Sequence, residues 1–274
     1  MHRSIQLASI VLFGGLASTA SATSLDFSNF SGPSSTSSTT NPNGTSWLFS
    51  DVTAGVDMVL ELTGISTVID TPGNPGDFTE IVDFSYGPDA NDLSGGDWLL
   101  INILHPNSTD DRFVDFTASF VDADDNSVAV TLDNYNITFG DLEYYYDPSD
   151  HFVESVTVSD AFCGNNSGAG SHIVMGSDSD GNLTAGHDFD SIDLSVFDDV
   201  DHQAQFGFVD SSGFSFTLEA EEPDFTIDGV QAINAQDNKF TISGSLSHLD
   251  CVPEPSSAVF LGLGGVLALM RRRR

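Results

Sequence analysis

Short runs in which apolar and polar residues alternate follow one another along most of this chain. The clearest begins at Val114 (VDFTASF), where every second residue is apolar. A period of two places those residues on one face of a β-strand. No stretch shows an apolar stripe at helical spacing, and the segments between the runs are rich in Asp, Asn, Gly, Pro and Ser, which favour turns. The pattern predicts an all-β protein, an antiparallel β-sandwich or jelly roll.

The expected strands belong to one body, residues 47–250, because no long linker or change of composition divides it. The loop-like segment Cys163–Gly170 leaves open a boundary between two smaller β-units. Residues 23–46 are expected to be a Ser/Thr-rich lead-in, either a plain linker or a stretch bearing O-linked sugars. Besides the run at Val114, the expected strands are Val56–Leu62, Phe78–Phe84, Trp98–Leu104, Ser127–Leu132, Tyr135–Phe139, Phe152–Val158, Ile192–Val196, Ala204–Val209, Phe214–Leu218, Phe225–Val230 and Phe240–Leu246.

The charge of the chain excludes one class of function. There are 41 Asp and Glu residues against 7 Lys and Arg, a formal net charge of −34. A chain this acidic repels phosphates, so ordinary nucleic-acid binding is excluded. The 21 Phe residues argue against wholesale disorder, because they can supply a core. Two interpretations of the acidity stay open: a solvated surface suited to salty water, or carboxylates partly neutralised by divalent cations.

The N-terminus has the three parts of a secretory signal peptide. Arg3 gives a short basic start, and a mostly apolar run from Ile5 to Ala17 follows it. Ala20 and Ala22 are the small residues that a signal peptidase requires, which predicts cleavage after Ala22. Residues 1–22 are therefore expected to be removed, and the mature chain is expected in an oxidising compartment outside the cytoplasm.

The C-terminus also has three parts. Val252, Pro253, Glu254 and Pro255 form a rigid, extended stretch, because each proline fixes its own φ and restricts the residue before it. An apolar run from 258 to 270 follows, long enough for a short hydrophobic helix of about 20 Å. The chain then closes on four arginines, which hold this end in the cytoplasm by the positive-inside rule. They are Arg271, Arg272, Arg273 and Arg274.

Residues 252–274 resemble the PEP-CTERM sorting signal, since the motif, the apolar segment and the basic tail stand in the family's order. The resemblance implies processing by an exosortase, a membrane cysteine protease of bacteria that also make exopolysaccharide. It implies cleavage near Pro253–Pro255, transient anchoring in the inner membrane, and delivery to the cell surface or extracellular matrix. Exopolysaccharide is a partner by the same implication. The bodies of proteins that share this signal are diverse, so the activity stays open.

Two acidic clusters are candidate calcium sites. Asp178, Asp180 and Asn182 alternate along a glycine-containing loop, and Asp122 and Asp124 follow an expected strand. Hard cations prefer carboxylate and carbonyl oxygens, and calcium is the one cofactor that the sequence suggests. Asp also favours turns through hydrogen bonds to its own backbone, so ordinary turns remain the alternative.

Cys163 and Cys251 are the two cysteines of the chain. Two cysteines cannot supply a four-ligand zinc site. In an exported protein a disulfide between them is favoured over two free thiols. It would join the segment before the sorting motif to an interior loop.

The remaining motifs do not predict an enzyme. The chain has no Gly-x-Ser-x-Gly nucleophile elbow, no His-Glu-x-x-His zinc motif and no glycine-rich phosphate loop. Trp98 and the run Tyr144–Tyr146 could form a sugar-stacking platform, but a role in the core is favoured. The scattered histidines are each expected on a surface or strand rather than as ligands; they are His105, His151, His172, His187, His202 and His248.

The sequence therefore predicts an exported, non-catalytic protein of the cell surface or matrix that acts by binding or by forming part of an extracellular layer. The alternative is a carbohydrate-active β-sandwich, either a lectin-like binder or a glycosidase, since this fold class hosts both. No pair among so many carboxylates can be nominated as a catalytic pair.

Overall fold

The computed structural model describes residues 22–32, 43–65, 81–88, 97–104, 112–142, 144–147, 150–166, 171–187, 202–221 and 237–244. They all belong to one compact unit, Ala22–Pro253. The two ends of the chain, Met1–Ser21 and Glu254–Arg274, form a separate unit that lies outside the described residues. The predicted signal peptide up to Ser21, and the predicted C-terminal helix, therefore fall outside the description.

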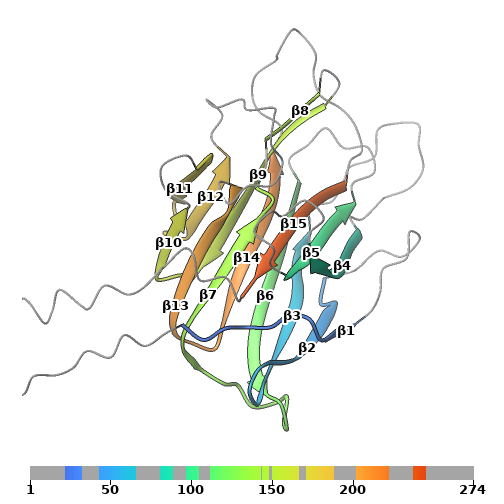
Figure 1. The fold of residues 1–274 in the computed structure, drawn as a ribbon, viewed down its shortest axis with the longest axis vertical. Coiled ribbons are helices and arrows are strands. Elements are labelled where there is room, and N and C mark those ends of the chain that lie inside the picture. The colour runs from blue at the N-terminus through green and yellow to red at the C-terminus, as the bar shows by residue number, and fades with distance from the viewer. Residues whose placement is uncertain are drawn as a thin grey trace, which may run out of the picture. The chain divides into compact units, whose positions relative to one another are not determined.

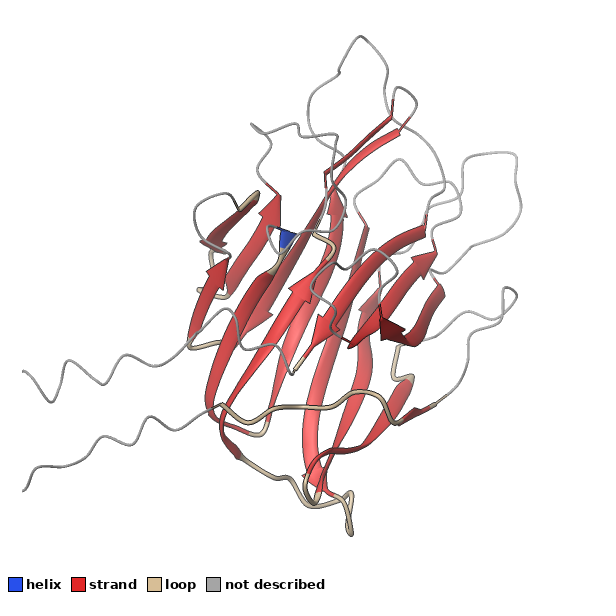
Figure 2. Ribbon diagram, in the orientation of Figure 1, coloured by secondary structure: helices blue, strands red, loops and turns tan. Residues whose placement is uncertain are grey.

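Within the described residues the strands form two antiparallel sheets, and strands make up nearly all of the regular structure (Figure 2). The larger sheet has nine strands. In pairing order they are β1 (Phe30–Ser31), β2 (Ser46–Thr53), β3 (Val56–Ile65), β6 (Arg112–Asp122), β14 (Gly213–Glu221), β9 (Asp150–Ser159), β12 (Leu183–His187) and β11 (Ile173–Ser177), with β8 (Tyr144–Asp147) added beside β9.

The second sheet has six strands, and it packs against the first as a sandwich (Figure 1). In pairing order they are β10 (Cys163–Asn166), β13 (Ala204–Ser211), β7 (Leu132–Gly140), β15 (Asp237–Ser243), β5 (Asp97–Leu104) and β4 (Ile81–Pro88). The predicted all-β sandwich is confirmed. No helix of the described part is long and apolar enough to cross a bilayer.

Aromatic side chains hold the two sheets together. Phe116 of β6 is paired in register with Phe216 of β14, and their rings stack with centroids 5.1 Å apart. Across the sandwich, Phe139 of β7 reaches the same Phe216 at 5.2 Å. The alternation that begins at Val114 places its apolar residues on this inner face, where Val114, Phe116, Ala118 and Phe120 are all buried. The high Phe content of the sequence is therefore explained by the core.

Polar side chains are also buried on the six-stranded sheet. Gln205 and Thr138 are both 0 % exposed, and the Nε2 of Gln205 donates to the Oγ1 of Thr138 at 3.0 Å. Trp98 is 1 % exposed and lies against Gly140, where an added Cβ would come within 3.4 Å of its ring. Trp98 is thus a packed residue rather than part of an exposed platform. Tyr144–Tyr146 lie in β8, and the positions of their side chains are not described.

The start of the body differs from the boundary at residue 47 that the sequence suggested. Thr23 bridges to Tyr135, and Leu25 bridges to Gly244 just after β15. Leu25 and Phe27 belong to the buried core, and β1 pairs with β2. We call residues 22–27 the N-terminal segment; it is drawn in blue across the lower part of the sandwich in Figure 1. The expected lead-in therefore contributes its first residues to the fold.

Two further expectations fail in the interior of the chain. Residues 123–131 form turns and a single bridge, so Ser127–Leu132 is not a strand, except for Leu132 at the start of β7. Cys163–Asn166, expected in a loop, pairs with β13 as strand β10. In both segments pairing decides the outcome: Ala129 makes a single bridge to Val121, whereas Cys163–Asn166 pair residue by residue with β13. The expected strands Ile192–Val196 and Phe225–Val230 lie outside the described residues.

Candidate functional site

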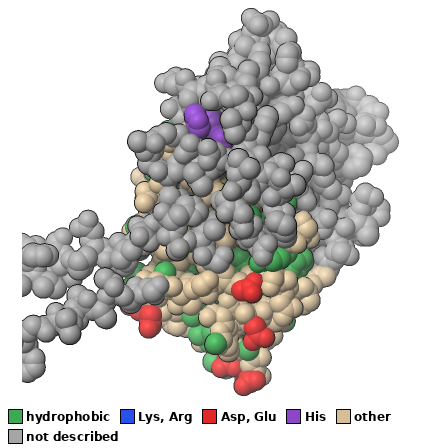
Figure 3. All heavy atoms as spheres, in the orientation of Figure 1, with side chains coloured by type: hydrophobic (Ala, Val, Ile, Leu, Met, Phe, Trp, Pro, Cys, Tyr) green, Lys and Arg blue, Asp and Glu red, His purple; other side chains and the backbone are tan. Residues whose placement is uncertain are grey.

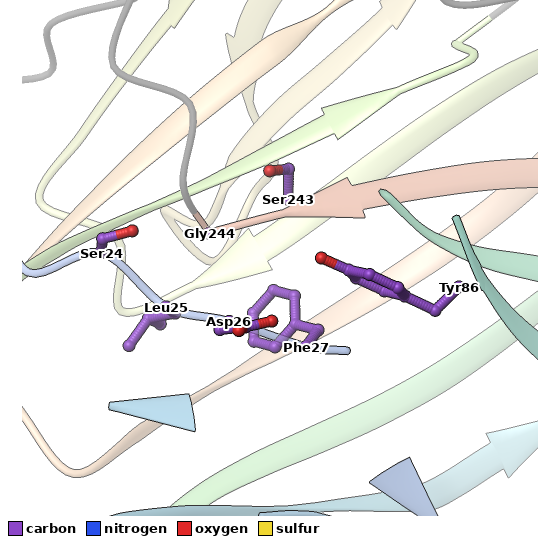
Figure 4. A pocket seen from close by; sticks show the side chains of 7 residues that line it. All are labelled: Ser24, Leu25, Asp26, Phe27, Tyr86, Ser243 and Gly244. Atoms are coloured by element: carbon purple, nitrogen blue, oxygen red, sulfur yellow. The ribbon is translucent and has the colours of Figure 1, made fainter. Parts of the chain in front are cut away.

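A pocket of about 250 Å³ opens where the N-terminal segment crosses the end of β15 and faces β4. Its walls are the backbone and side chains of Ser24–Phe27, Tyr86 of β4, and the pair Ser243 and Gly244. Figure 4 shows the Tyr86 hydroxyl extending toward the N-terminal segment that carries Asp26 and Phe27. Three separate parts of the sequence therefore meet around one opening.

Backbone hydrogen bonds fix the N-terminal wall of this pocket. The amide of Leu25 donates to the carbonyl of Gly244 at 2.9 Å, and the amide of Asp26 donates to the carbonyl of Val52 at 2.8 Å. Leu25 is 1 % exposed and Phe27 is 3 % exposed, so apolar burial reinforces these bonds. Gly244 permits the close approach, because a Cβ there would lie 2.5 Å from the Cβ of Leu25. These contacts fix the position of the wall without any bound ligand.

The polar groups of the pocket are one carboxylate and several hydroxyls. The Oδ1 of Asp26 accepts a hydrogen bond from the amide of Ser28 at 2.9 Å, which holds the carboxylate in a fixed orientation. Ser24, Ser243 and Tyr86 also line it, and Ser243 is only 3 % exposed. Among the described residues, the lining includes no Lys, Arg or His. The described part of the lining therefore combines a carboxylate, hydroxyl groups and apolar side chains.

A second cluster brings together three histidines that the sequence analysis treated as scattered. His172 precedes β11, His187 ends β12, and His202 precedes β13. Their ring centroids lie 5.2 to 5.7 Å apart, and the ring planes are within 17° of parallel. The pairing of Ile173 with His187 in the β11–β12 hairpin brings the first two together. Figure 3 shows histidine at the surface in this part of the molecule.

The sequence could not have grouped these histidines, because they are well separated along the chain. The register of the β11–β12 hairpin and the position of β13 bring them together. His187 is 6 % exposed, so the cluster reaches into the body. Across the described residues, no group of three or more His, Cys, Asp or Glu side chains is arranged so that it could hold a metal ion.

Asp178 caps the turn between β11 and β12. Its Oδ1 accepts from the amides of Asp180 and Asn182, both at 2.9 Å, and its Oδ2 accepts from the Nδ2 of Asn182 at 2.8 Å. These bonds, that from the Asn182 side chain foremost, lower the pKa of Asp178. Gly181 closes the turn at φ +89°. The carboxylate that the sequence suggested as a calcium ligand thus accepts hydrogen bonds within its own turn, and its binding of calcium stays a prediction.

The acidic cluster at the end of β6, Asp122–Asp125, also makes hydrogen bonds within its own turn. The Oδ1 of Asp122 accepts from the amide of Asp124 at 2.8 Å and from that of Asp125 at 3.3 Å. Asp125 in turn accepts from the hydroxyl of Ser127 at 2.6 Å and from its amide, which lowers the pKa of Asp125. Acidic side chains gather at the lower end of the surface in Figure 3.

The other predicted site residues divide between described and undescribed parts of the chain. Cys163 is disulfide-bonded, while Cys251 lies outside the described residues, so their pairing stays a prediction. Ala22 is the first described residue. The remaining cleavage, motif and basic-tail residues lie outside the description: Ala20, Val252, Pro253, Glu254, Pro255 and Arg271–Arg274.

Comparisons with known proteins identify no family. No family model matches the sequence, and no curated protein matches it. One solved structure similar to this chain is the glucan-binding protein C of Streptococcus mutans, described as mediating sucrose-independent and sucrose-dependent adherence. The identity is 11 % and the TM-score 0.26, over 73 % of this chain and 62 % of that one, so the chain spans about three fifths of its length. This similarity is too low to carry an argument about fold or function.

Proposed function

We propose that this protein is an exported, non-catalytic β-sandwich of the cell surface or extracellular matrix, delivered through an exosortase-type sorting signal. One observation carries the proposal. The cleavage points expected from the sequence, after Ala22 and near Pro253–Pro255, fall next to the limits of the compact unit Ala22–Pro253. Processing at both points would release one self-contained body and remove only the address segments.

The contacts of the N-terminal segment support cleavage after Ala22. The nitrogen of Thr23 donates to the carbonyl of Asn134 at 2.7 Å, and the ammonium group that cleavage creates there can make the same bond. The apolar anchors Leu25 and Phe27 lie beyond the cut and stay buried. Cleavage at this point therefore removes none of the core side chains.

The test is the mass of the protein recovered outside a host that carries an exosortase. We expect an N-terminus at Thr23 and a C-terminus within Pro253–Pro255. A matched variant that replaces Pro253, Glu254 and Pro255 with alanine should remain with the inner membrane and keep Arg274. Recovery of exported wild-type protein that still ends at Arg274 would contradict processing.

A carbohydrate-binding role is the second candidate, and the pocket beside the N-terminal segment is the observation that favours it. Saturable binding to a defined sugar on a glycan array would favour this role over a purely structural one. Hydrolysis of any glycan by the purified protein would overturn the non-catalytic part of the proposal.

A further inference from the structure

We propose that one corner of the body faces the membrane, with Phe162 against the lipid surface, while the C-terminal segment is still anchored there. We call it the β10–β13 corner; it consists of Thr23, Asn134, Phe162, Cys163 and Val209. The inference rests on the proposed sorting role, because the anchored stage precedes processing. It goes further by naming the surface of the body that meets the lipid and the bond that holds it there.

The body begins at the β10–β13 corner. The nitrogen of Thr23 donates to the carbonyl of Asn134 at 2.7 Å, and Asn134 pairs with Val209 of β13. In Figure 1 the blue N-terminal segment starts beside the lower end of β13. The chain that precedes Thr23, which includes the expected signal peptide, is therefore joined to the body at this corner.

The register of the six-stranded sheet directs the other end of the body toward the same corner. Ser243 of β15 pairs with Thr138 of β7. Thr138 pairs with Gln205 of β13, and Gln205 pairs with Asn165 of β10. These three strand spacings amount to about 14 Å. Because each pairing is antiparallel, a chain that continues beyond β15 moves toward the level of Cys163, at the start of β10.

A bond between Cys163 and Cys251 fits this register. Cys163 is disulfide-bonded, and Cys251 is the other cysteine of the chain. Seven residues, 245–251, lead from Gly244 to that cysteine, and a stretch of this length reaches up to about 25 Å. This reach exceeds the roughly 14 Å across the sheet. The bond would therefore place the start of the sorting motif at the β10–β13 corner.

The same bond would shorten the tether between the body and the membrane. Residues 252–257 separate Cys251 from the apolar run that begins at 258, so the corner would lie within about 25 Å of that run. Without the bond the tether would start at Gly244 and could reach about 50 Å. A short tether raises the effective concentration of the lipid surface at the corner, so even weak contacts form there.

The corner presents apolar side chains that suit a lipid surface. Phe162 is 54 % exposed, while its amide is fixed by a 2.8 Å bond to the carbonyl of Gly207. Val209, two residues further along β13, is 38 % exposed. Phe is one of the side chains that lie at the boundary between headgroups and acyl chains. Asp160 and Asp210 are exposed beside them and are repelled by anionic headgroups, so we expect contact at the headgroup level rather than deep insertion.

Tryptophan fluorescence tests whether the corner meets the lipid. Phe162→Trp is made in the exported but unprocessed chain, residues 23–274, from a host that lacks an exosortase. The protein is bound to phosphatidylcholine vesicles with and without a spin label on the headgroups. Trp47 and Trp98 are 3 % and 1 % exposed, so they give a constant background. We expect the spin label to remove most of the fluorescence that the substitution adds.

Phe113→Trp is the matched control. Phe113 is 37 % exposed near the start of β6. It stands seven residues before Phe120, whose ring meets Tyr135, the neighbour of Asn134. This separation is about 23 Å along the strand, so the tryptophan of this variant should keep its fluorescence.

A second pair of proteins tests the tether. Cys163→Ala and Cys251→Ala are made together in the Phe162→Trp chain, and quenching should fall because the tether lengthens. Melting temperatures check that each variant folds. Addition of phosphatidylglycerol should also weaken the quenching, because Asp160 and Asp210 are repelled by its charge.

Three results would overturn the inference: equal quenching of Phe162→Trp and Phe113→Trp, no quenching of Phe162→Trp, or quenching that is unchanged when both cysteines are removed. Flotation of the protein with the vesicles separates this inference from the proposed function. A chain that does not float with the vesicles overturns both the anchoring and the inference. A chain that floats without quenching of Phe162→Trp overturns the inference alone.

Discussion

The ring of Tyr135 stacks on that of Phe208, with centroids 4.8 Å apart and planes within 8° of parallel. The edge of Phe120, from the opposite sheet, meets the same tyrosine at 5.0 Å. The Tyr135 hydroxyl donates to the carbonyl of Gly213 at 3.3 Å. One fully buried side chain thus joins β7, β13 and the start of β14 through both packing and a hydrogen bond.

Tyr135→Phe should lower the free energy of unfolding by about 1 kcal/mol, because it removes the hydroxyl bond and keeps the ring. Tyr135→Ala should cost about 3–5 kcal/mol, since a large cavity opens between the sheets. Urea unfolding of the three proteins measures both differences. Equal stability of the alanine and phenylalanine variants would contradict the packing role.

Alkaline pH should destabilise the protein through the same residue. Burial raises the pKa of Tyr135 above its ordinary value. The hydrogen bond with the Ser211 side chain lowers this pKa, and the negative charge of Asp160 raises it further. The unfolded chain therefore releases this proton first, so stability is full below about pH 10 and falls above it. Unfolding at pH 8 and pH 11 should show a smaller fall for Tyr135→Phe than for the wild type.

Acidic pH should act on the turn at Asp178. Its hydrogen bonds, above all that from Asn182, lower the pKa of the carboxyl in the folded state. The stabilisation is present above the unfolded pKa, near 4, and is lost as the pH falls through the lower folded value. Asp178→Ala should therefore lower Tm by about 2 °C at pH 7 and have little effect at pH 2.

Two matched variants separate the carboxylate from the turn. Asp178→Asn keeps an acceptor for the two amides but loses the bond from the Asn182 side chain, so its effect should be smaller than that of alanine. Asp180 donates its backbone amide to Asp178, and Asp180→Asn leaves that amide in place. This variant should therefore melt like the wild type. A loss in Asp178→Ala that is independent of pH would contradict the electrostatic account.

Reduction of the disulfide should destabilise the body. Cys163 is disulfide-bonded, and a bond to Cys251 would close a loop of about 88 residues, worth on the order of 4 kcal/mol in the chain-entropy model. Thiol titration of the unfolded protein should find no free thiol before reduction and two afterwards. Cys163→Ser should melt as the reduced wild type does. A free thiol in the unreduced protein would contradict the bond.

Calcium and magnesium should raise Tm alike and weakly. The carboxylates of Asp178 and Asp122 already accept hydrogen bonds from their own turns, while calcium requires six to eight oxygens around one point. Divalent ions then act mainly by screening the net charge of −34. Melts with calcium, with magnesium and with EDTA at matched ionic strength measure this. A rise in Tm that is specific to calcium and that Asp178→Ala abolishes would contradict this expectation and support a calcium site.

The sequence predicted strands well where alternation was clean and failed where short polar segments had to be assigned. The run at Val114 became β6 because its apolar residues have one face to occupy, against β14 and the opposite sheet. Residues 163–166 carry no such alternation, and their strand exists because β13 offers an unpaired edge. The pocket could not be predicted, because Asp26 and Tyr86 meet only through the path of the N-terminal segment across the sheets.

The sequence by itself determined the fold class, the acidity and the expected address segments, since each depends on local composition or on period-two patterning. The tertiary structure alone decided which strands pair, that Leu25 and Phe27 are part of the core, and that three histidines from separate segments meet. It also turned the acidic clusters into capped turns. The physical reason is that register and long-range contacts depend on how whole faces pack together, and no local pattern encodes that choice.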